Sequence, residues 1–332
     1  VTVASLAERL ADPLWLARLD QPDTRLHSSY DRTGGNNDYG TFLRDSSTPG
    51  WKVLADLKGP GYVSRVWFTG AKDGQPHRFR FFFDGEQTPR LAGDIKELFG
   101  GQFAPFLAPL AEYNNYCWYS FVPMPYSKNL RIECEQGPPE DSGAPRKVYY
   151  QVAESALPRG TPVETFAWPL PERDLAALEK ARGVWQTNRL PPAGELRESD
   201  LAEGQERIRI AGPGVIRRLE FEPQWDRIPE ESRDAILRDW LVAIRYDGST
   251  NDSVKVPLGD LCGLPWRRVR TQSLYFGMTG NALFCAFPMR FAESVEIRLE
   301  AGKISPVPVK IRAWMAARPE ASAGRLGYFH AG

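Results

Sequence analysis

The chain has 332 residues, and its 42 Lys and Arg residues balance 42 Asp and Glu residues, so the formal net charge is zero. A neutral chain lacks the basic surface that attracts nucleic acids and anionic membranes, and no apolar run approaches the ~18 residues of a membrane span. The four cysteines have no CxxC spacing, which argues against a structural zinc site, and four in a chain this long do not form a disulfide scaffold.

The predicted elements begin with a helix within residues 1–19, where Ser5 and Glu8 match an S-x-x-E capping box. Residues 27–50 are rich in Gly, Asn, Asp and Ser and are expected to form a loop. Short apolar and aromatic runs with a period near two follow, and these predict strands separated by turns. A short helix is expected at 170–182, after which the strand pattern resumes to about Met315.

An internal repeat is the most informative feature of the sequence. Five blocks occur twice, in the same order and at nearly constant offset. The paired blocks are LKGPGYVSRVWF and IAGPGVIRRLEF, FFFDGE and IRYDGS, ELFGG and DLCGL, VPMPYSKNLRIECE and FPMRFAESVEIRLE, and KVYYQV and VKIRAW. A longer offset between later blocks predicts an insertion after Phe221, in the segment QWDRIPEESRDAILRDW.

The repeat predicts a mainly all-β protein with two tandem antiparallel jelly-roll or β-sandwich domains and a few short helices. Each copy holds roughly eight strands without the intervening helices that parallel sheets need. The expected organisation is an N-terminal helix and polar loop (1–44), a first jelly roll (45–160), a linker with a short helix (161–204) and a second jelly roll (205–332). Asp-Gly pairs at Asp84 and Asp247 predict hairpin turns.

Residues 28–40 form the segment with the most chemistry, SSYDRTGGNNDYG. Carboxylates and amides bind vicinal hydroxyls, and aromatic faces cover the C–H patches of sugars. The candidate substrate-binding residues are therefore Tyr30, Asp31, Arg32, Asn36, Asn37, Asp38 and Tyr39. Asp31 and Asp38 are also candidates for an acid–base pair of glycoside hydrolysis. The alternative is an ordered surface loop whose charges pair with each other.

A second cluster of aromatic residues invites a sugar-stacking interpretation. It consists of Tyr113, Tyr116, Trp118, Tyr119 and Phe121. Alternation along a strand explains the cluster better, because one face of the strand would fill the core and the other would meet a neighbour. No P-loop, dinucleotide-binding, GxSxG or HExxH motif is present in the sequence, so no metal site is expected.

The blocks SSYDRTGGNNDYG, VLADLKGPGYVSRVWFT, FFFDGE, ELFGG and YSFVPMPYSKNLRIE, in that order, resemble the family once called domain of unknown function 2961, now linked to glycoside hydrolase family 172. The resemblance covers most of 25–155 and, through the repeat, 205–331. It implies jelly rolls, assembly into trimers or hexamers, action on fructofuranosides or arabinofuranosides, and no cofactor. It also implies that residues 30–39 line the substrate pocket.

One departure from the family leaves the activity open. The resemblance implies a further β region with a GTGTEDYF-like motif, whose Glu belongs to the catalytic pair, and this motif is not in the sequence. The chain could be the N-terminal part of a longer glycosidase or act beside a separate C-terminal catalytic segment. It could instead be a non-catalytic carbohydrate-binding or assembly-forming protein, or an enzyme that uses Asp31 and Asp38. The compartment stays open between secreted, periplasmic and cytoplasmic.

Overall fold

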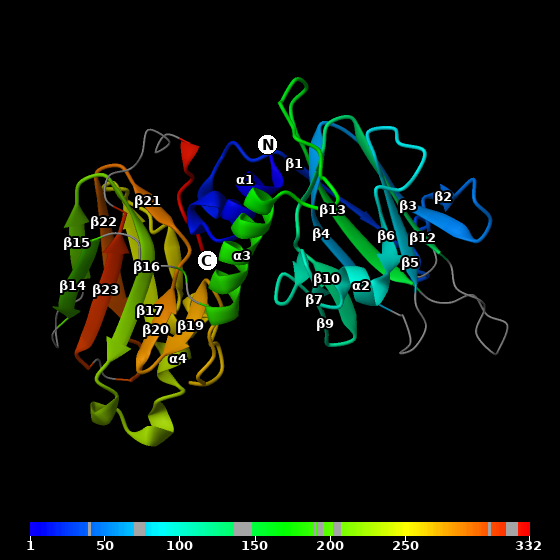
Figure 1. Ribbon diagram of the computed structural model, residues 1–332. Helices are drawn as coiled ribbons and strands as arrows, with labels where there is room; N and C mark the ends of the chain where they lie inside the picture. Colours follow the sequence, from blue (N-terminus) through cyan, green and yellow to red (C-terminus); the bar gives the residue numbers. More distant parts are fainter. Residues whose placement is uncertain are drawn as a thin grey trace. The chain divides into compact units, whose positions relative to one another are not determined.

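The chain folds into two compact units. A computed structural model describes residues 1–38, 41–69, 77–135, 148–188, 190, 195–201, 207–304, 307–316 and 325–332. The first unit comprises Val1–Ala11 and Pro22–Thr187, and the second comprises Asp12–Gln21 and Asn188–Gly332. Figure 1 labels the helices and strands of both.

The first unit contains two antiparallel sheets and a small hairpin. One sheet has the order β1-β13-β4-β10-β9, with β11 also paired to β4, and the other has the order β2-β3-β12-β5-β6. The strands are β1 (Asp23–Ser28), β2 (Arg44–Asp45), β3 (Trp51–Lys58), β4 (Gly61–Thr69), β5 (Arg78–Phe83), β6 (Leu91–Asp94), β7 (Gln102–Phe103), β8 (Phe106–Leu107), β9 (Ala111–Asn114), β10 (Cys117–Ser120), β11 (Met124–Tyr126), β12 (Asn129–Glu135) and β13 (Tyr149–Ala156).

The path of the chain through these sheets is that of a jelly roll. From β1 it passes to β3 in the other sheet, returns to β4, and crosses again to the β5–β6 pair. It then returns to β10, crosses to β12 and ends in β13, which lies between β1 and β4. All the strand pairs along this path are antiparallel, as expected of a double-sheet jelly roll.

The second unit repeats this order, except that its described residues show no counterpart of the short edge strand β2 or of the β7–β8 hairpin. Its sheets are β14-β23-β16-β20-β19, with β21 paired to β16, and β15-β22-β17-β18. The strands are β14 (Glu195–Leu201), β15 (Arg207–Ala211), β16 (Gly214–Pro223), β17 (Leu241–Tyr246), β18 (Val254–Pro257), β19 (Phe276–Thr279), β20 (Ala282–Cys285), β21 (Met289–Phe291), β22 (Ser294–Glu300) and β23 (Val309–Met315). The predicted fold class, two tandem antiparallel jelly rolls, is therefore confirmed.

Two strands lie outside the jelly-roll ranges that the sequence suggested. β1 starts before the polar loop and pairs with β13, whereas β14 falls in the expected linker and pairs with β23. Neither Asp23–Ser28 nor Glu195–Leu201 shows apolar alternation, because both strands lie at the edge of a sheet. Their extended conformation follows from pairing with a distant strand, which local sequence patterns do not report.

The helices are short, and the N-terminal one begins earlier than predicted. Helix α1 (Val3–Leu10) is capped by Thr2, whose hydroxyl accepts from the Ser5 amide, so the predicted cap at Ser5 is wrong by three positions. The chain then forms a 3-10 turn, η1 (Pro13–Ala17), because proline cannot continue an α-helix. The structure also has α2 (Ile95–Phe99), α3 (Glu172–Thr187), α4 (Ile236–Asp239) and α5 (Leu258–Leu261), and the 3-10 turns η2 (Trp225–Arg227) and η3 (Glu230–Ser232).

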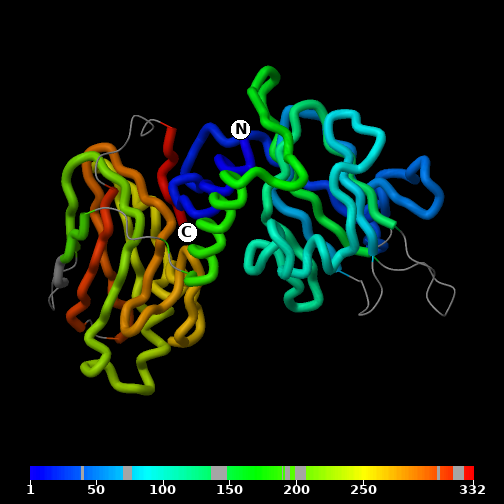
Figure 2. Tube along the Cα trace, in the orientation of Figure 1, coloured from blue at the N-terminus to red at the C-terminus, as the bar shows by residue number. Residues whose placement is uncertain are grey.

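Helix α3 confirms the helix predicted at 170–182 and belongs to the first unit. It runs beside α1, as the blue and green segments of Figure 2 show. The indole Nε1 of Trp185 on α3 donates to the carbonyl of Leu10 at the end of α1, at 2.8 Å. This bond satisfies one of the carbonyl groups that a helix C-terminus leaves unpaired.

Each sandwich has an apolar core between its sheets. In the first unit the alternating residues Phe79, Phe81 and Phe83 of β5 are at most 1% exposed, and Phe79 packs against Phe68 and Phe99. In the second unit the core includes Trp240 and Phe221, both fully buried. Full burial of a large apolar side chain contributes about 2–3 kcal/mol, so these positions dominate the packing energy.

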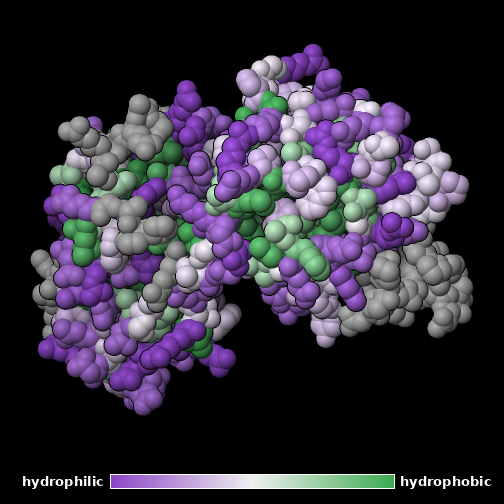
Figure 3. Space-filling view, in the orientation of Figure 1, coloured by the Kyte–Doolittle hydropathy of each residue, from purple (hydrophilic) through white to green (hydrophobic). Residues whose placement is uncertain are grey.

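The outer faces of the second unit's sheets carry ion pairs instead. On the β15-β22-β17-β18 sheet, Arg298 lies 2.7 Å from Asp252, which also pairs with Arg245. On the other sheet, Arg312 pairs with Glu198 and Glu222, both at 2.8 Å. Hydrophilic residues accordingly cover most of this unit in the view of Figure 3.

The repeated Gly-Pro-Gly turns have a packing reason. At Gly61, an added Cβ would lie 2.4 Å from the Tyr126 hydroxyl and 2.7 Å from its ring. At Gly214, it would lie 2.8 Å from the ring of Phe291, the residue that occupies the same place in the second copy. The last glycine of each turn is thus needed because an aromatic side chain packs directly on the backbone.

Candidate functional site

The polar segment 28–38 leaves β1 and folds into a compact surface loop of the first unit. Its base is fixed by Ser29, which is 4% exposed and exchanges hydrogen bonds with Tyr150 of β13. Beyond this anchor, the side chains from Tyr30 to Asn37 are exposed or half-buried. The loop therefore presents its side chains to solvent from a rigid attachment point on the sheet.

The Asp31 carboxylate organises the turn that follows it. Its Oδ1 accepts from the Thr33 amide at 2.9 Å and the Thr33 hydroxyl at 2.6 Å, and its Oδ2 accepts from the Asn37 amide at 3.1 Å. An added Cβ at Gly35 would lie 2.6 Å from Oδ2, so the glycine lets the backbone close around this carboxylate. Gly34, with φ +81°, supplies the left-handed residue of the turn.

These hydrogen bonds set the protonation of Asp31. The Thr33 hydroxyl, followed by the amides of Thr33 and Asn37, holds the pKa of Asp31 below its ordinary value. A general acid needs a carboxyl group whose pKa is raised, usually by burial or a neighbouring negative charge. Asp31 is therefore suited to accept hydrogen bonds or to stabilise positive charge, and not to donate a proton near neutral pH.

Asp38 closes the loop from its other end. Its Oδ1 accepts from the backbone amide of Asp31 at 2.8 Å, and the Thr41 hydroxyl donates to the Asn37 carbonyl at 3.2 Å. Asp31 and Asp38 are thus brought into one turn, as the sequence suggested, although each carboxylate accepts hydrogen bonds from the loop itself. Tyr39, also a predicted site residue, lies outside the described residues.

Arg32 and Tyr30 form a stacked pair on this surface. The guanidinium carbon lies 4.3 Å from the centre of the Tyr30 ring, and Nη1 donates to the Tyr30 carbonyl at 2.6 Å. Tyr30 is 55% exposed. The pair offers an aromatic surface beside a guanidinium, in the same loop as the exposed side chains of Asn36 and Asn37. This combination can bind hydroxyl groups and a C–H face together.

The second aromatic cluster serves mainly to pack strands. Trp118 is 8% exposed and contacts Tyr113 with ring centres 4.5 Å apart, and Phe121 lies 5.1 Å from Trp185 of α3. Tyr119 donates its hydroxyl to Glu112 on the neighbouring strand. Tyr116 stands out in solvent, at 84% exposed, and Tyr113 is 39% exposed.

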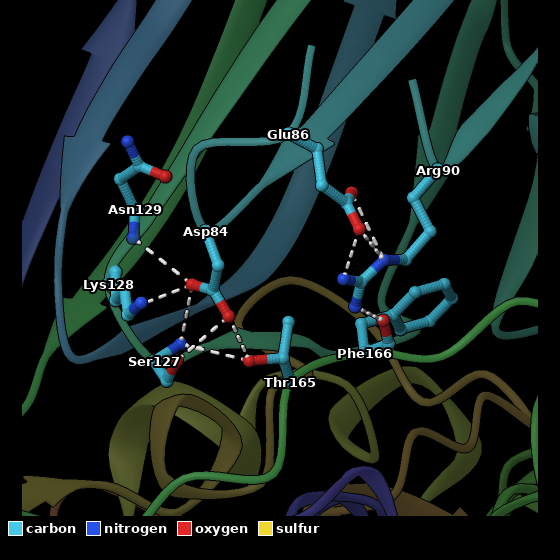
Figure 4. Close-up of polar contacts among 8 residues, drawn as sticks. All are labelled: Asp84, Glu86, Arg90, Ser127, Lys128, Asn129, Thr165 and Phe166. Carbon is cyan, nitrogen blue, oxygen red and sulfur yellow. Dashed lines mark hydrogen bonds and ion pairs between the residues drawn. The ribbon is translucent and has the colours of Figure 1, made fainter. Parts of the chain in front are cut away.

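Two carboxylates, which the sequence analysis placed only in hairpin turns, also hold the jelly rolls together, one in each unit. Asp84 and Gly85 both have positive φ, as the predicted Asp-Gly hairpin requires, and the Asp84 carboxylate accepts from the amides of Ser127, Lys128 and Asn129. It also accepts from the Thr165 hydroxyl (Figure 4). Burial acts to raise the pKa of Asp84, but these hydrogen bonds outweigh it and lower the pKa.

Asp247 repeats the arrangement in the second unit. It accepts from the amides of Ala292, Glu293 and Ser294 and from the Tyr328 hydroxyl at 2.6 Å. We call Asp84 and Asp247 with their donors the turn clasps. The FFFDG and IRYDG repeats could have pointed to them, but the donors lie about 40 residues further along the chain. The turn clasps are structural and lie outside the polar loop.

Metal and membrane sites have no support among the described residues. No three His, Cys, Asp or Glu side chains there converge in a way that could hold a metal ion. None of the described helices combines the length and the apolar content that a membrane crossing requires. All four cysteines are free thiols, and burial raises the pKa of Cys134 and Cys285 to about 12.

Two family models match the chain. Residues 20–174 match the first β-sandwich domain of GH172, and residues 199–310 match a GH172 domain-like model. The fold and these matches define a tandem jelly-roll protein of a carbohydrate-active class. The chain belongs to the family linked to glycoside hydrolase family 172 (GH172), as the sequence motifs suggested.

Comparisons with individual proteins add little. No curated protein matches the sequence. Among solved structures, the chain is similar to the atomic structure of Sulfolobus Turreted Icosahedral Virus, with 10% identity over 89% of this chain and 90% of that chain, at a TM-score of 0.22. It is also similar to the STIV MCP, with 9% identity over 90% of this chain and 98% of that chain, at a TM-score of 0.21. Similarities at these scores support no argument about function.

Proposed function

We propose that this chain is the jelly-roll part of a furanoside-acting glycoside hydrolase, of the fructofuranosidase or arabinofuranosidase type. In this proposal the loop 28–38 binds the sugar, and a separate segment with a GTGTEDYF-like motif supplies the catalytic Glu. The supporting observation is the loop itself, in a chain of a carbohydrate-active family. Its backbone is fixed by Asp31 and Asp38, while Tyr30, Arg32, Asn36 and Asn37 face outward.

The second candidate function is carbohydrate binding without catalysis. It needs no carboxyl group that stays protonated, and Asp31, whose pKa is lowered by its hydrogen bonds, is not such a group. The third possibility is an enzyme that uses Asp31 and Asp38 as its catalytic pair. It requires one of these two carboxyl groups to stay protonated near neutral pH.

A binding measurement tests the role of the loop. Asp38→Ala should abolish binding of arabinofuranosyl and fructofuranosyl oligosaccharides at this loop, seen in isothermal titration calorimetry as the loss of one binding site, because the turn that presents the side chains opens. Its effect on the free energy of unfolding should stay near 1 kcal/mol, since only one hydrogen bond to the loop backbone is lost. Asp45→Ala, at an exposed carboxylate of the same unit, is the matched control and should bind normally.

The contrary outcome is equally clear. If Asp38→Ala costs several kcal/mol of stability and leaves sugar binding intact, the loop is a structural clasp and the proposal fails.

Turnover by the 332-residue chain alone is expected to be poor. It should be assayed on aryl α- and β-arabinofuranosides and fructofuranosides. Robust hydrolysis that disappears in both Asp31→Asn and Asp38→Asn would contradict the expectation. It would instead establish these two residues as the catalytic pair.

We further propose that the chain forms a homo-oligomer, a trimer or hexamer. Its support is the number of large side chains left in solvent, including Phe103 (56% exposed), Trp266 (71%) and Tyr116 (84%). Such residues are typical of surfaces that are covered by a partner. Multi-angle light scattering at micromolar concentration should give a mass several times 37.4 kDa, and a single 37.4 kDa species would refute the proposal.

A further inference from the structure

The second jelly roll contains an insertion that the first does not match in length. The connection from β16 to β17 spans residues 224–240, whereas that from β4 to β5 spans only 70–77. The insertion holds η2, η3 and α4. It is anchored by buried Trp225, Ile228 and Trp240, and by Asp239, whose carboxylate accepts from the amides of Lys303 and Ile304.

The first turn of this insertion forms one wall of a cavity. The cavity has a volume of about 790 Å³ and lies where the outer face of β16 and β23 meets η2. It is lined by Glu222, Pro223, Gln224, Trp225, Asp226, Asn281, Pro308, Val309, Lys310 and Arg312, all of the second unit. Its size lies within the range of small-ligand sites, about 300–1,000 Å³.

The charged groups of the lining are balanced. Two carboxylates, Glu222 and Asp226, face two cations, Lys310 and Arg312. Arg312 is already neutralised, because it pairs with Glu222 and Glu198 at 2.8 Å and lies 3.6 Å from Glu220. Lys310 likewise lies 3.6 Å from Glu198. An anionic ligand therefore meets a carboxylate beside each cation, and a cationic ligand meets Lys310 and Arg312. The lining favours a neutral ligand.

The uncharged groups of the lining indicate which neutral ligand fits. Within the described part of the chain, the side-chain amides of Gln224 and Asn281 and the carboxylate of Asp226 have no hydrogen bond or ion pair. They offer both donors and acceptors to hydroxyl groups. Trp225 is 7% exposed and fixes the wall, because its Nε1 donates to the Asn281 carbonyl at 2.7 Å, and half-buried Pro308 adds apolar surface.

We propose that this cavity is a carbohydrate-binding site of the second jelly roll. Its ligand is a neutral oligosaccharide whose hydroxyl groups bond to Gln224, Asn281, Asp226 and Glu222 and whose C–H groups contact the apolar surface of Pro308. The site consists of residues of the second unit alone, whereas the loop 28–38 belongs to the first. It does not depend on the function proposed for that loop.

The test uses the full chain carrying Asp38→Ala, so that the loop is disabled and the remaining binding is measured. Arabino- and fructo-oligosaccharides are titrated by calorimetry into this protein and into versions that also carry Gln224→Ala or Asn281→Ala. Each added change should weaken the remaining binding at least tenfold. Both side chains lack partners, so stability should not change. Asn251→Ala, another exposed amide of this unit, is the matched control and should bind as the parent does.

Two results would overturn the inference. One is the absence of binding of either oligosaccharide to the Asp38→Ala protein. The other is equal affinity of the Gln224→Ala and Asn281→Ala proteins and their parent. Failure of the loop proposal gives a different result. In that case the Asp38→Ala protein should bind these oligosaccharides with the same affinity as the wild-type chain does.

Discussion

Asp84→Ala is expected to lower the free energy of unfolding of the first jelly roll by about 3 kcal/mol, because it removes a carboxylate that accepts from three backbone amides. The amides of Ser127, Lys128 and Asn129 would lose a charged acceptor at the start of β12, and Thr165 would lose its partner. Urea unfolding followed by circular dichroism measures the change.

The control for this experiment is Asp56→Ala. Asp56 is also in the first unit, but among the described residues its one ion pair is with Arg44 at the surface. Its removal should change stability by less than about 1 kcal/mol. Equal losses of stability in Asp84→Ala and Asp56→Ala would mean that the turn clasp stabilises the unit no more than a surface ion pair does.

The second turn clasp predicts a pH dependence. Burial acts to raise the pKa of Asp247, but the Tyr328 hydroxyl and the amides of residues 292–294 lower it to about 2. The unfolded chain therefore binds a proton at higher pH than the folded one does. The stabilisation is complete above about pH 4 and is lost as pH falls towards 2. Asp247→Asn should flatten the dependence of the free energy of unfolding on pH in this window. Near neutral pH the slope of that dependence should not change.

Trp240→Ala is expected to destabilise the second jelly roll by about 4 kcal/mol, the size of effect seen when a fully buried large aromatic residue is truncated. Trp240 is the last residue of the insertion, directly before β17, and its Nε1 donates to the Ile304 carbonyl at 3.2 Å. Thermal unfolding of the variant should show the transition of this unit at clearly lower temperature.

Trp240→Phe separates the two contributions of this side chain. It keeps most of the apolar volume and loses the hydrogen bond, so its cost should be about 1 kcal/mol plus a small packing term. If Trp240→Ala proves nearly neutral, the insertion is not part of the folded core and the cavity beside it has no fixed wall.

The sequence predicted the elements that carry their own pattern. The alternation in 78–83 and 129–135, the Asp-Gly turns and the duplicated blocks were sufficient to define two jelly rolls. The edge strands β1 and β14 could not be predicted in this way, because pairing with β13 and β23 makes them strands.

The candidate site was likewise predictable only where its residues are adjacent in the chain. The polar loop was visible from composition, since its residues are adjacent in the chain. The hydrogen bonds within the loop are local, yet which carboxylate accepts from which amide depends on backbone geometry. The cavity beside η2 could not be found at all, because Gln224, Asn281 and Pro308 come from three distant segments.

The assignment of Asp12–Gln21 to the second unit has a consequence for any attempt to divide the protein. Leu19 and Gly327 join this segment to the C-terminal residues through backbone hydrogen bonds to Arg325 and Ala17, and Asp12 pairs with Arg217. A fragment starting at residue 188 would lack this piece, and one ending at 187 would carry it unpaired. The duplicated halves are thus not separable modules at this boundary: the first half of the gene encodes a segment that stabilises the second unit, and a cut between residues 187 and 188 separates the two.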